Sequence, residues 1–329
     1  MDGSGLTRAV VATGFGGPEV VSVVDTPIGP PGAEEVLIEV RAAATNPVDY
    51  KMFSGAYGRD PAALPMPVGR EAAGVVAAVG ERAAGPAGVI EVGAEVVAYP
   101  IVGAYAGAVV VPASSVVPKP STLSFEQASG LMLAGVTAVH ALKVTRVGTG
   151  DTVLIHGAAG GVGLMAVQLA VAAGARAIGT ASQSGHAYLR ELGAEPVSYG
   201  EGLLERIQAI APDGIDAAVD TVGSDEAVNT SVALVADRDR IVTIVAFQRG
   251  LELGIKVIGG APGADPGTEI RAAARLELTR LAETGNLSVL VAATYPLAEA
   301  ADALRALATG HTHGKIVLVT EPIAAITSD

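Results

Sequence analysis

The stretch TVLIHGAAGGVG, residues 152–163, decides how the middle of this chain folds. It begins as an apolar strand, continues as a glycine-rich turn and leads into an apolar segment of helical character at 162–173. Glycines in such a turn allow a tight bend and let a pyrophosphate approach the backbone N–H groups that open the helix. An ordinary glycine-rich turn is the alternative, but the flanking strand and helix favour a dinucleotide site. Its predicted contacts are Gly157, Ala158, Gly160, Gly161, Val162 and Gly163.

The end of the next predicted strand, 175–180, bears on which dinucleotide binds. NAD sites usually place an acidic residue there to hold the ribose diol. Here the segment TASQSG, residues 180–185, offers hydroxyl groups and no acid. Hydroxyls and cations donate hydrogen bonds to a 2′-phosphate, which a carboxylate would repel. We therefore predict NADPH rather than NADH, with an ordinary polar loop as the alternative; the predicted contacts are Ser182, His186 and Tyr199.

Helices and strands alternate after residue 124. Such alternation is typical of a parallel, doubly wound sheet. Strands are expected at 152–155, 175–180, 217–220 and 240–245, and helices at 125–142, 162–173, 185–192, 225–235 and 269–283.

The first third of the chain has a different pattern. Short β-like runs at 36–40, 74–79 and 108–111 are separated by glycine and proline. Many short strands between turn signals predict a barrel-like antiparallel fold. A last helix and strand are expected at 298–307 and 315–319.

Composition and charge narrow the function classes. A chain of 329 residues exceeds what one hydrophobic core usually serves, so two domains are expected. Half of the residues are apolar but only 3% are aromatic, which predicts a core of Ala, Val, Leu and Ile. The formal charge of -13 argues against binding to nucleic acid or to anionic lipid.

The sequence also indicates the redox chemistry and the compartment. It contains no cysteine, which excludes disulfides, thiolate nucleophiles and cysteine-ligated zinc. Residues 1–8 hold no apolar signal core, and the longest apolar stretch, 164–175, is too short and interrupted to span a bilayer. We expect a cytoplasmic protein. His311 and His313 are expected to be surface residues and not a metal pair.

Several further motifs resemble those of one enzyme superfamily. They are NPVDYK at 46–51, PVGREAAGVV at 67–76, GAYA at 103–106, LAGVTA at 133–138, DTVG at 220–223 and GKIVL at 314–318. Together with the glycine loop, they resemble the zinc-independent medium-chain dehydrogenase/reductase superfamily, close to its quinone oxidoreductase branch, nearly end to end.

The resemblance implies an α/β fold with two domains. A GroES-like β-barrel catalytic domain would comprise residues 1–123 and 292–329, and a Rossmann domain with a parallel sheet would comprise 124–291. The active site would lie in the cleft between them. Relatives often form homodimers, so a homodimer is expected on this ground alone.

Departures from the zinc-dependent relatives predict that no metal is bound. Those relatives place a cysteine near Asn46 and a histidine before Glu71, where this chain has Arg70. With neither ligand present, a catalytic zinc has no coordinating shell.

By resemblance, Asn46, Lys51 and Tyr57 would face the nicotinamide and the acceptor, with Tyr50 close by. Asn46 is expected to orient the acceptor as an amide donor. Lys51 or a tyrosine hydroxyl is expected to supply a hydrogen bond or proton. The alternatives are local ones, because Asn-Pro often opens a turn and a lysine is often solvated.

The resemblance also extends the cofactor site beyond the glycine loop. Thr137 would approach the nicotinamide, Val222 the adenosine half, and Val245 and Phe247 the nicotinamide ribose. Lys315 would lie near the mouth of the cleft.

The sequence thus predicts a reductase that passes hydride from NADPH to a quinone or an α,β-unsaturated carbonyl compound. An enoyl-thioester reductase of a biosynthetic pathway is a second interpretation, although no basic cluster for a carrier phosphate is apparent. A non-catalytic NADPH-binding sensor is a third.

Overall fold

The computed structural model describes residues 5–310 and 312–321, so His311 lies outside the described part. Contacts divide the chain into two compact units. Unit 1 comprises residues 1–133 and 276–329, and unit 2 comprises residues 134–275. The domain boundaries predicted from the sequence, at 123/124 and 291/292, differ from the limits of these units. They stay a prediction.

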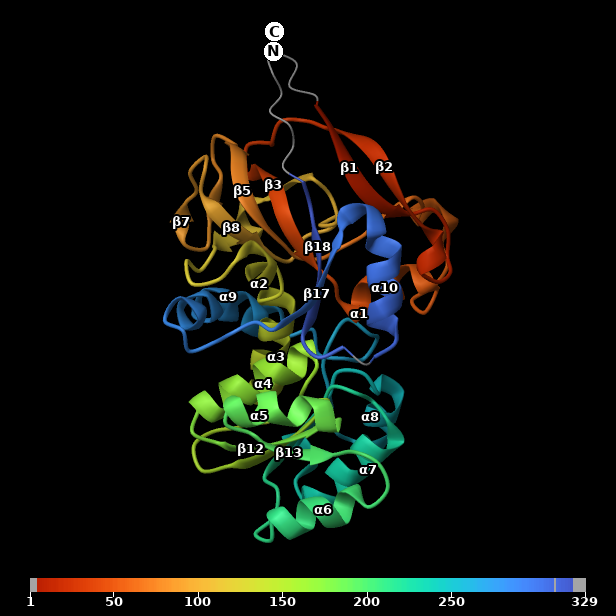
Figure 1. The fold of residues 1–329 in the computed structure, drawn as a ribbon, viewed down its shortest axis with the longest axis vertical. Coiled ribbons are helices and arrows are strands. Elements are labelled where there is room, and N and C mark those ends of the chain that lie inside the picture. Colours follow the sequence, from red (N-terminus) through yellow and green to blue (C-terminus); the bar gives the residue numbers. More distant parts are fainter. Residues whose placement is uncertain (1–4, 311, 322–329) are drawn as a thin grey trace. The chain divides into compact units, whose positions relative to one another are not determined.

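Unit 1 contains the GroES-like β-structure that the sequence predicts (Figure 1). Its largest sheet has the order β10-β8-β5-β3-β18-β17, and β9 also pairs with β3. The last strand of the chain, β18, runs antiparallel to β3 and parallel to β17, so the C-terminal region completes this sheet. The strands are β1 (Gly5–Ala12), β2 (Val21–Ile28), β3 (Glu35–Ala44), β4 (Met66–Pro67), β5 (Ala72–Val79), β6 (Ala84–Gly85), β7 (Gly88–Val89), β8 (Glu95–Ala98), β9 (Ala108–Pro112), β10 (Val116–Pro118), β17 (Val291–Pro296) and β18 (Lys315–Val319).

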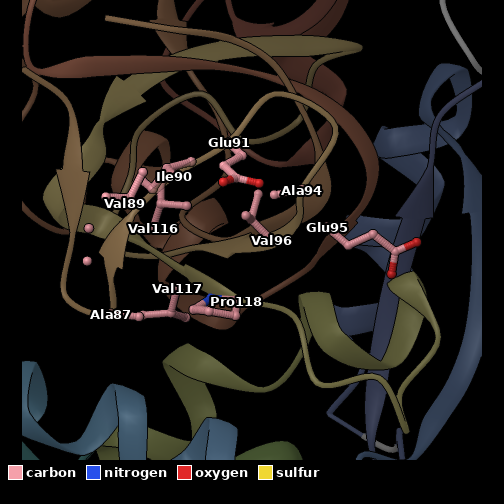
Figure 2. A pocket seen from close by; sticks show the side chains of 12 residues that line it. Ala87, Val89, Ile90, Glu91, Ala94, Glu95, Val96, Val116, Val117 and Pro118 are labelled. Atoms are coloured by element: carbon pink, nitrogen blue, oxygen red, sulfur yellow. The ribbon is translucent and has the colours of Figure 1, made fainter. Parts of the chain in front are cut away.

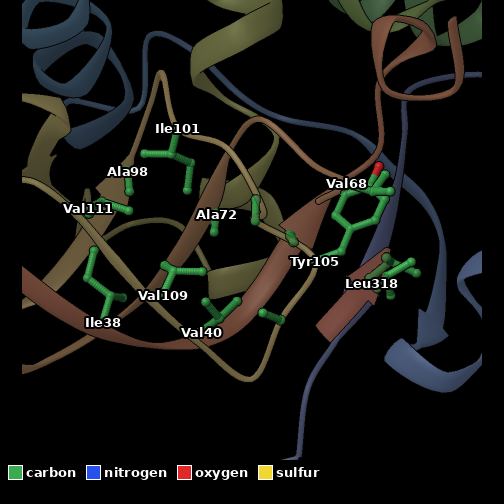
Figure 3. Close-up of a cluster of buried hydrophobic side chains, with 14 of the residues drawn as sticks. Ile38, Val40, Val68, Ala72, Ala98, Ile101, Tyr105, Val109, Val111 and Leu318 are labelled. Atoms are coloured by element: carbon green, nitrogen blue, oxygen red, sulfur yellow. The ribbon is translucent and has the colours of Figure 1, made fainter. Parts of the chain in front are cut away.

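The core of unit 1 is aliphatic, as the composition predicts. Figure 3 shows Ile38, Val40 and Val109 among the buried side chains, with the ring of Tyr105 beside Val68. The helices of this part are α1 (Pro47–Ser54), α2 (Phe125–Ser129), α3 (Met132–Val144), α9 (Thr268–Glu283) and α10 (Ala300–Ala308), of which α3 and α9 continue into unit 2.

Unit 2 is a parallel, doubly wound sheet. Its strand order, β13-β12-β11-β14-β15-β16, is the order 3-2-1-4-5-6 of dinucleotide-binding folds. Helices α4 and α5 cover one face, and α6 and α7 cover the other (Figure 1). The strands are β11 (Thr152–His156), β12 (Arg176–Ala181), β13 (Glu195–Ser198), β14 (Ala217–Asp220), β15 (Ile241–Thr243) and β16 (Lys256–Val257); the helices are α4 (Gly161–Ala172), α5 (His186–Glu191), α6 (Leu203–Ile210), α7 (Asp225–Leu234) and α8 (Phe247–Leu253).

One predicted element was wrong in detail. The single helix expected at 125–142 is two helices, because the chain breaks at Gly130 between α2 and α3. A side chain at Gly130 would meet the aliphatic stem of Lys315, 2.9 Å from its Cγ. The absence of a side chain at Gly130 therefore leaves room for a lysine that belongs to the candidate site.

Within the described residues, no helix is long and apolar enough to cross a membrane.

Candidate functional site

The N-terminus of α1 fixes the first group of predicted residues. Asn46 is the N-cap with extended backbone, and Pro47 follows at the first helical position, where its missing N–H costs nothing. The carboxylate of Asp49 accepts the backbone N–H of Asn46 at 2.8 Å. The Asn-Pro pair thus opens a helix, and Asp49 caps it locally.

A buried ion pair lies beside this helix end. The ammonium of Lys315, at the start of β18, donates to Oδ1 of Asn46 at 2.6 Å and to Oε1 of Glu71 at 3.2 Å. Glu71, which precedes β5, is fully buried, and Lys315 is 4% exposed. A buried charge is tolerated when it is paired and hydrogen-bonded. Lys315 and Glu71, the two charged members of this cluster, meet that condition.

The contacts of Asn46 limit what its amide can do. Its Nδ2 donates to Glu71 Oε1 at 3.0 Å and to the carbonyl of Ala44 at 3.3 Å. Both amide hydrogens are therefore used inside the protein. The predicted role of Asn46 as a donor to the acceptor would require it to give up one of these bonds; the geometry instead makes Asn46 a holder of the Lys315 ammonium.

Glu71 connects this cluster to the next segment of unit 1. Its second oxygen, Oε2, accepts the backbone N–H of Leu133 at 2.8 Å, in the first turn of α3. One carboxylate thus bonds an ammonium, an amide and a helix N-terminus. The resemblance placed Glu71 in a motif but gave it no role, and its burial is what identifies it.

Lys315 was predicted at the mouth of a cleft as a cofactor contact. The structure places its ammonium against Asn46, which was predicted to be catalytic, and against Glu71, nearly out of reach of solvent. Its contact with the cofactor stays a prediction. A protonated lysine has three N–H donors, and the bonds to Asn46 and Glu71 use two of them.

Asp49 and Tyr105 form a second polar pair next to this cluster. The Tyr105 hydroxyl donates to Asp49 Oδ2 at 2.7 Å, while Oδ1 of the same carboxylate is buried and has no hydrogen-bond partner. Burial raises the pKa of Asp49 to about 6, although the bonds from Tyr105 and Asn46 favour its charged form. Burial, followed by the nearby Asp49, raises the pKa of Tyr105 well above its ordinary value.

The other predicted catalytic residues lie apart from these bonds. Tyr50 and Lys51 are half-buried on α1, and Tyr57, beyond its end, is 45% exposed. Burial raises the pKa of Tyr50. In the described residues, no hydrogen bond joins the side chain of Tyr50, Lys51 or Tyr57 to Asn46 or Lys315, and their catalytic roles stay predictions.

The glycine loop of unit 2 has the local geometry expected of a pyrophosphate site. Gly157 has φ +70°, in the left-handed region, and a side chain there would lie 2.6 Å from Thr221 Oγ1. A side chain at Gly163 would lie 2.2 Å from the carbonyl oxygen of Gly157, so α4 packs directly on the turn. At Gly160, by contrast, a side chain would meet only that carbonyl oxygen, at 3.3 Å. Of these three glycines, Gly160 is therefore the most open, and it lies at the helix N-terminus, where a phosphate can approach.

The loops after β14 and β15 are held by a buried carboxylate. Oδ1 of Asp220 accepts the backbone N–H groups of Val222 and Gly223 at 2.9 and 2.8 Å. Its Oδ2 accepts the Thr243 hydroxyl at 2.7 Å, and Thr243 Oγ1 in turn accepts N–H groups after β15. Asp220 thus positions backbone at the carboxyl ends of two parallel strands, where ligands of such sheets bind.

The residues predicted to bind a 2′-phosphate differ from one another in their exposure to solvent. Ser182 follows β12, and its hydroxyl lies 3.0 Å from that of Ser184. Tyr199 follows β13 and is 54% exposed. His186 is buried, with Nε2 3.3 Å from the carbonyl of Ala181, so only its other ring nitrogen remains for a ligand. The segment after β12 holds no acidic side chain.

The remaining predicted cofactor contacts are distributed over unit 2. Thr137 is buried in α3, whereas Val222 is 48% exposed after β14. Val245 and Phe247 are half-buried between β15 and the first turn of α8. Val222 and Val245 follow the carboxyl ends of the neighbouring strands β14 and β15, and their contacts with a cofactor stay predictions.

Unit 1 contains a cavity of about 170 Å³ that is lined by other residues than those predicted for the site (Figure 2). It is bordered by the β6–β7 hairpin and by Val116, Val117 and Pro118. Its carboxylates are Glu91 and Glu95, and Glu95 pairs with Lys119 at 3.1 Å. None of the predicted site residues lines it.

Comparison with protein families matches two segments of the chain. Residues 32–121 match the alcohol dehydrogenase GroES-like domain, and residues 192–318 match a family described as zinc-binding dehydrogenase. A quinone oxidoreductase of Pseudomonas aeruginosa is 35% identical over 341 residues, covering 95% of this chain and 100% of that protein. The chain belongs to the medium-chain dehydrogenase/reductase superfamily, in its quinone oxidoreductase-like branch.

Solved structures of this superfamily share the fold over nearly the whole chain. A mycobacterial protein complexed with NADPH is 32% identical, with a TM-score of 0.81 and coverage of 95% of this chain and 99% of that one. The CurK enoyl reductase is 26% identical, with a TM-score of 0.83 and coverage of 96% and 99%. The predicted superfamily and fold class are confirmed.

A zinc ion does not fit the residues that stand at the superfamily's ligand positions. Oδ1 of Asn46 already accepts from an ammonium, and the guanidinium of Arg70 has no lone pair to offer. Nor do the described residues include a group of three or more His, Cys, Asp or Glu side chains placed to hold a metal ion. At these positions the chain therefore differs from the zinc-binding members that give the matched family its description.

Proposed function

We propose that this member of the superfamily is a zinc-independent reductase that transfers hydride from NADPH to a quinone or an α,β-unsaturated carbonyl compound. The observation that carries the proposal is the buried Lys315 ammonium, held by Asn46 and Glu71 at positions beside the absent zinc ligands. It supplies a fixed positive charge without a metal. The quinone oxidoreductase relatives support the substrate class.

When bound, NADPH supplies the hydride. The residues of the chain then need to orient the acceptor and stabilise the negative charge that develops on its oxygen. The third N–H of Lys315 is the donor that we assign to that oxygen. Asn46 and Glu71 hold the ammonium in place, so they act as positioning residues.

Proton delivery is assigned to the half-buried Lys51 or to the exposed Tyr57. Replacing either residue, as Lys51→Ala or Tyr57→Phe, is expected to slow turnover and to leave NADPH binding nearly unchanged. If both variants keep full activity, water delivers the proton and this assignment is wrong.

NADPH is proposed over NADH because hydroxyl groups and no acid follow β12. The test compares kcat/KM for NADPH and NADH in the wild type and in Ser182→Asp, with one quinone as acceptor. We expect the NADPH preference to fall at least tenfold in the variant, since a carboxylate repels the 2′-phosphate and accepts from a ribose diol. Ser184→Asn, which adds no charge, is the matched control. An unchanged preference would place the 2′-phosphate elsewhere.

Enoyl-thioester reduction is the second candidate, favoured by the similarity to the CurK enoyl reductase. It uses the same hydride transfer to a conjugated carbonyl. Turnover of a small enoyl thioester at a higher kcat/KM than any quinone would decide for it.

A further inference from the structure

Three buried polar side chains in unit 2 connect helix α7 with the glycine loop. They are Ser231 on α7, His156 at the end of β11 and Thr180 in β12, and none of them is more than 2% exposed. His156 lies between the other two, with Nε2 3.1 Å from Ser231 Oγ and Nδ1 3.3 Å from Thr180 Oγ1. We call these three side chains the His156 relay. Because they are buried, their hydrogen bonds are made with protein groups, and counting hydrogens shows which atom donates to which.

The Ser231 end of the relay fixes the position of the imidazole proton. The Ser231 hydroxyl donates to the carbonyl of Ala227 at 2.9 Å. A carbonyl oxygen only accepts, so this bond uses the single hydrogen of the hydroxyl. Towards His156, Ser231 Oγ can therefore only accept, and the proton of the imidazole lies on Nε2.

The protonation state of His156 determines the role of its other nitrogen. Burial lowers the pKa of His156 below its ordinary value of 6.5, and the nearby Asp220 and Glu226 carboxylates offset this only in part. The imidazole is therefore neutral at pH 7 and carries one hydrogen. Since that hydrogen is on Nε2, Nδ1 is an acceptor, and the Thr180 hydroxyl donates to it.

The Thr180 end of the relay holds the beginning of the glycine loop. The backbone N–H of Gly157 donates to Thr180 Oγ1 at 3.3 Å, and the N–H of Ala158 donates to the Thr180 carbonyl at 2.9 Å. Thr180 opens the TASQSG segment, but its hydroxyl hydrogen is used by His156 and is not left for a 2′-phosphate. The bonds of Thr180 instead position the turn at Gly157.

We propose that His156 is a positioning residue for NADPH: its Nε2–H tautomer orients the Thr180 hydroxyl, which holds the Gly157 N–H in the turn that receives the pyrophosphate. This inference rests on the proposed NADPH site, although the tautomer is a property of the protein alone. The opposite tautomer would place a hydrogen between Nδ1 and Thr180 Oγ1 and leave Nε2 without a donor, because Ser231 has no second hydrogen to give. A change at Ser231 is therefore expected to alter the glycine loop.

The tautomer is measured first, in the full chain without nicotinamide. The chain has 5 histidines, so ¹⁵N labelling of histidine gives few ring signals, in which protonated and unprotonated nitrogens have well-separated shifts. At pH 7.5 we expect Nε2 of His156 to be protonated and Nδ1 to be unprotonated. A hydrogen on Nδ1 would overturn the proposal.

Ser231→Ala tests whether the relay reaches the cofactor site. Loss of the Oγ acceptor is expected to populate the Nδ1–H tautomer of His156 and to raise the dissociation constant for NADPH about fivefold, which fluorescence titration measures. The matched control is Thr145→Val, which removes another fully buried hydroxyl of unit 2, bonded to backbone carbonyls of α3, and is expected to keep the NADPH affinity. An unchanged tautomer in Ser231→Ala, or a changed tautomer with unchanged NADPH affinity, would refute the positioning role.

The Thr180 hydroxyl is tested by two substitutions. Thr180→Val leaves the Gly157 N–H without an acceptor and is expected to weaken NADPH binding about tenfold, whereas Thr180→Ser keeps the hydroxyl and is expected to recover most of that loss. Equal affinities in the two variants would contradict the proposal; if Thr180→Val does not fold, Ser231→Ala decides. If the wild type itself does not bind NADPH, the proposed function fails, and the tautomer alone then decides whether the relay exists.

Discussion

At the scale of single residues, the candidate catalytic cluster of unit 1 depends on charges that are buried and paired. Glu71 is fully buried and Lys315 nearly so, and each satisfies the other together with Asn46. In such a cluster, the cost of removing one partner comes mainly from the charge left behind.

Lys315→Met is therefore expected to destabilise the fold by about 3–5 kcal/mol, because it removes the cation that pairs with the buried Glu71 carboxylate. In the double variant Lys315→Met/Glu71→Gln, part of the lost free energy of unfolding is expected to be recovered. Denaturant unfolding measures both. The matched control is Arg82→Met, in an ion pair with Glu34 whose side chains are 69% and 77% exposed, where about 1 kcal/mol or less is expected. Additive losses in the double variant would show that the two charges are not coupled.

Asp49 gives a pH dependence whose sign follows from its burial. Its pKa is raised from 3.8 to about 6, so the folded state binds a proton more tightly than the unfolded state does. The stabilisation from the protonated form is present below about pH 4 and is lost as the pH rises through about 6. The nearby Lys315, Glu71 and Tyr105 are common to wild type and variant, so the comparison isolates Asp49.

We expect the free energy of unfolding of the wild type, minus that of Asp49→Asn, to fall between about pH 4 and 6 and then to level off. Urea unfolding at several pH values measures this difference. A ¹³C NMR titration of the Asp49 carboxyl group provides the same information if the variant does not fold. A difference that rises with pH would mean that the Asp49 pKa is lowered and not raised.

At the scale of elements, glycines in the turn between β11 and α4 have two different functions, helix packing and access for a phosphate. Gly163 is needed for packing, because its Cβ would clash with the Gly157 carbonyl at 2.2 Å. A methyl group at Gly160 would make a single close contact, 3.3 Å from the Gly157 carbonyl oxygen, which a small shift of the turn relieves. Its open side is the position at which we place the pyrophosphate.

Gly160→Ala is thus expected to leave the unfolding midpoint within a few degrees of wild type and to weaken NADPH binding at least tenfold. Gly163→Ala is expected to lower both stability and binding. Thermal unfolding and fluorescence titration measure the two effects. Gly148→Ala, at a position with no atom within 4 Å of a Cβ, is the control in the same unit. Unchanged NADPH affinity in Gly160→Ala would place the pyrophosphate away from this loop.

Many of the helices and strands of unit 2 could be predicted from the sequence. The strand at 152–156, the helix after it and the alternation that follows depend on local apolar periodicity and glycine spacing, which the chain displays directly. The break at Gly130 was not predicted, and neither was the need for a glycine there, which comes from the Lys315 stem at the other end of the chain. The short helix α8 also gave no pattern, since it has few residues and contains Gly250.

The candidate site was less predictable for the same reason. Lys315 and Glu71 lie 244 positions apart, and nothing local to either residue indicates that they form a pair. Asn46 was selected by its motif, but its role as a positioning residue depends on which atoms its amide contacts. Asp220 likewise became informative only when its bonds to Val222, Gly223 and Thr243 were known.

At the scale of the whole molecule, two units of different construction each carry part of the proposed function. Unit 1 has the buried ammonium and its partners, and unit 2 has the glycine loop and the strand ends of a dinucleotide-binding fold. Both parts match relatives that cover nearly the whole chain. The central claim joins them in a single reaction, hydride transfer to a conjugated carbonyl or quinone without a metal.

The most direct test is the single-turnover oxidation of NADPH by chelator-treated protein, with 1,4-benzoquinone and 2-cyclohexenone as acceptors. We predict saturable NADPH oxidation with at least one of them, unaffected by the chelator and slowed when the transferable hydrogen of NADPH is replaced by deuterium. Saturable NADPH binding without oxidation by either acceptor, or oxidation that appears only after zinc is added, would contradict the account.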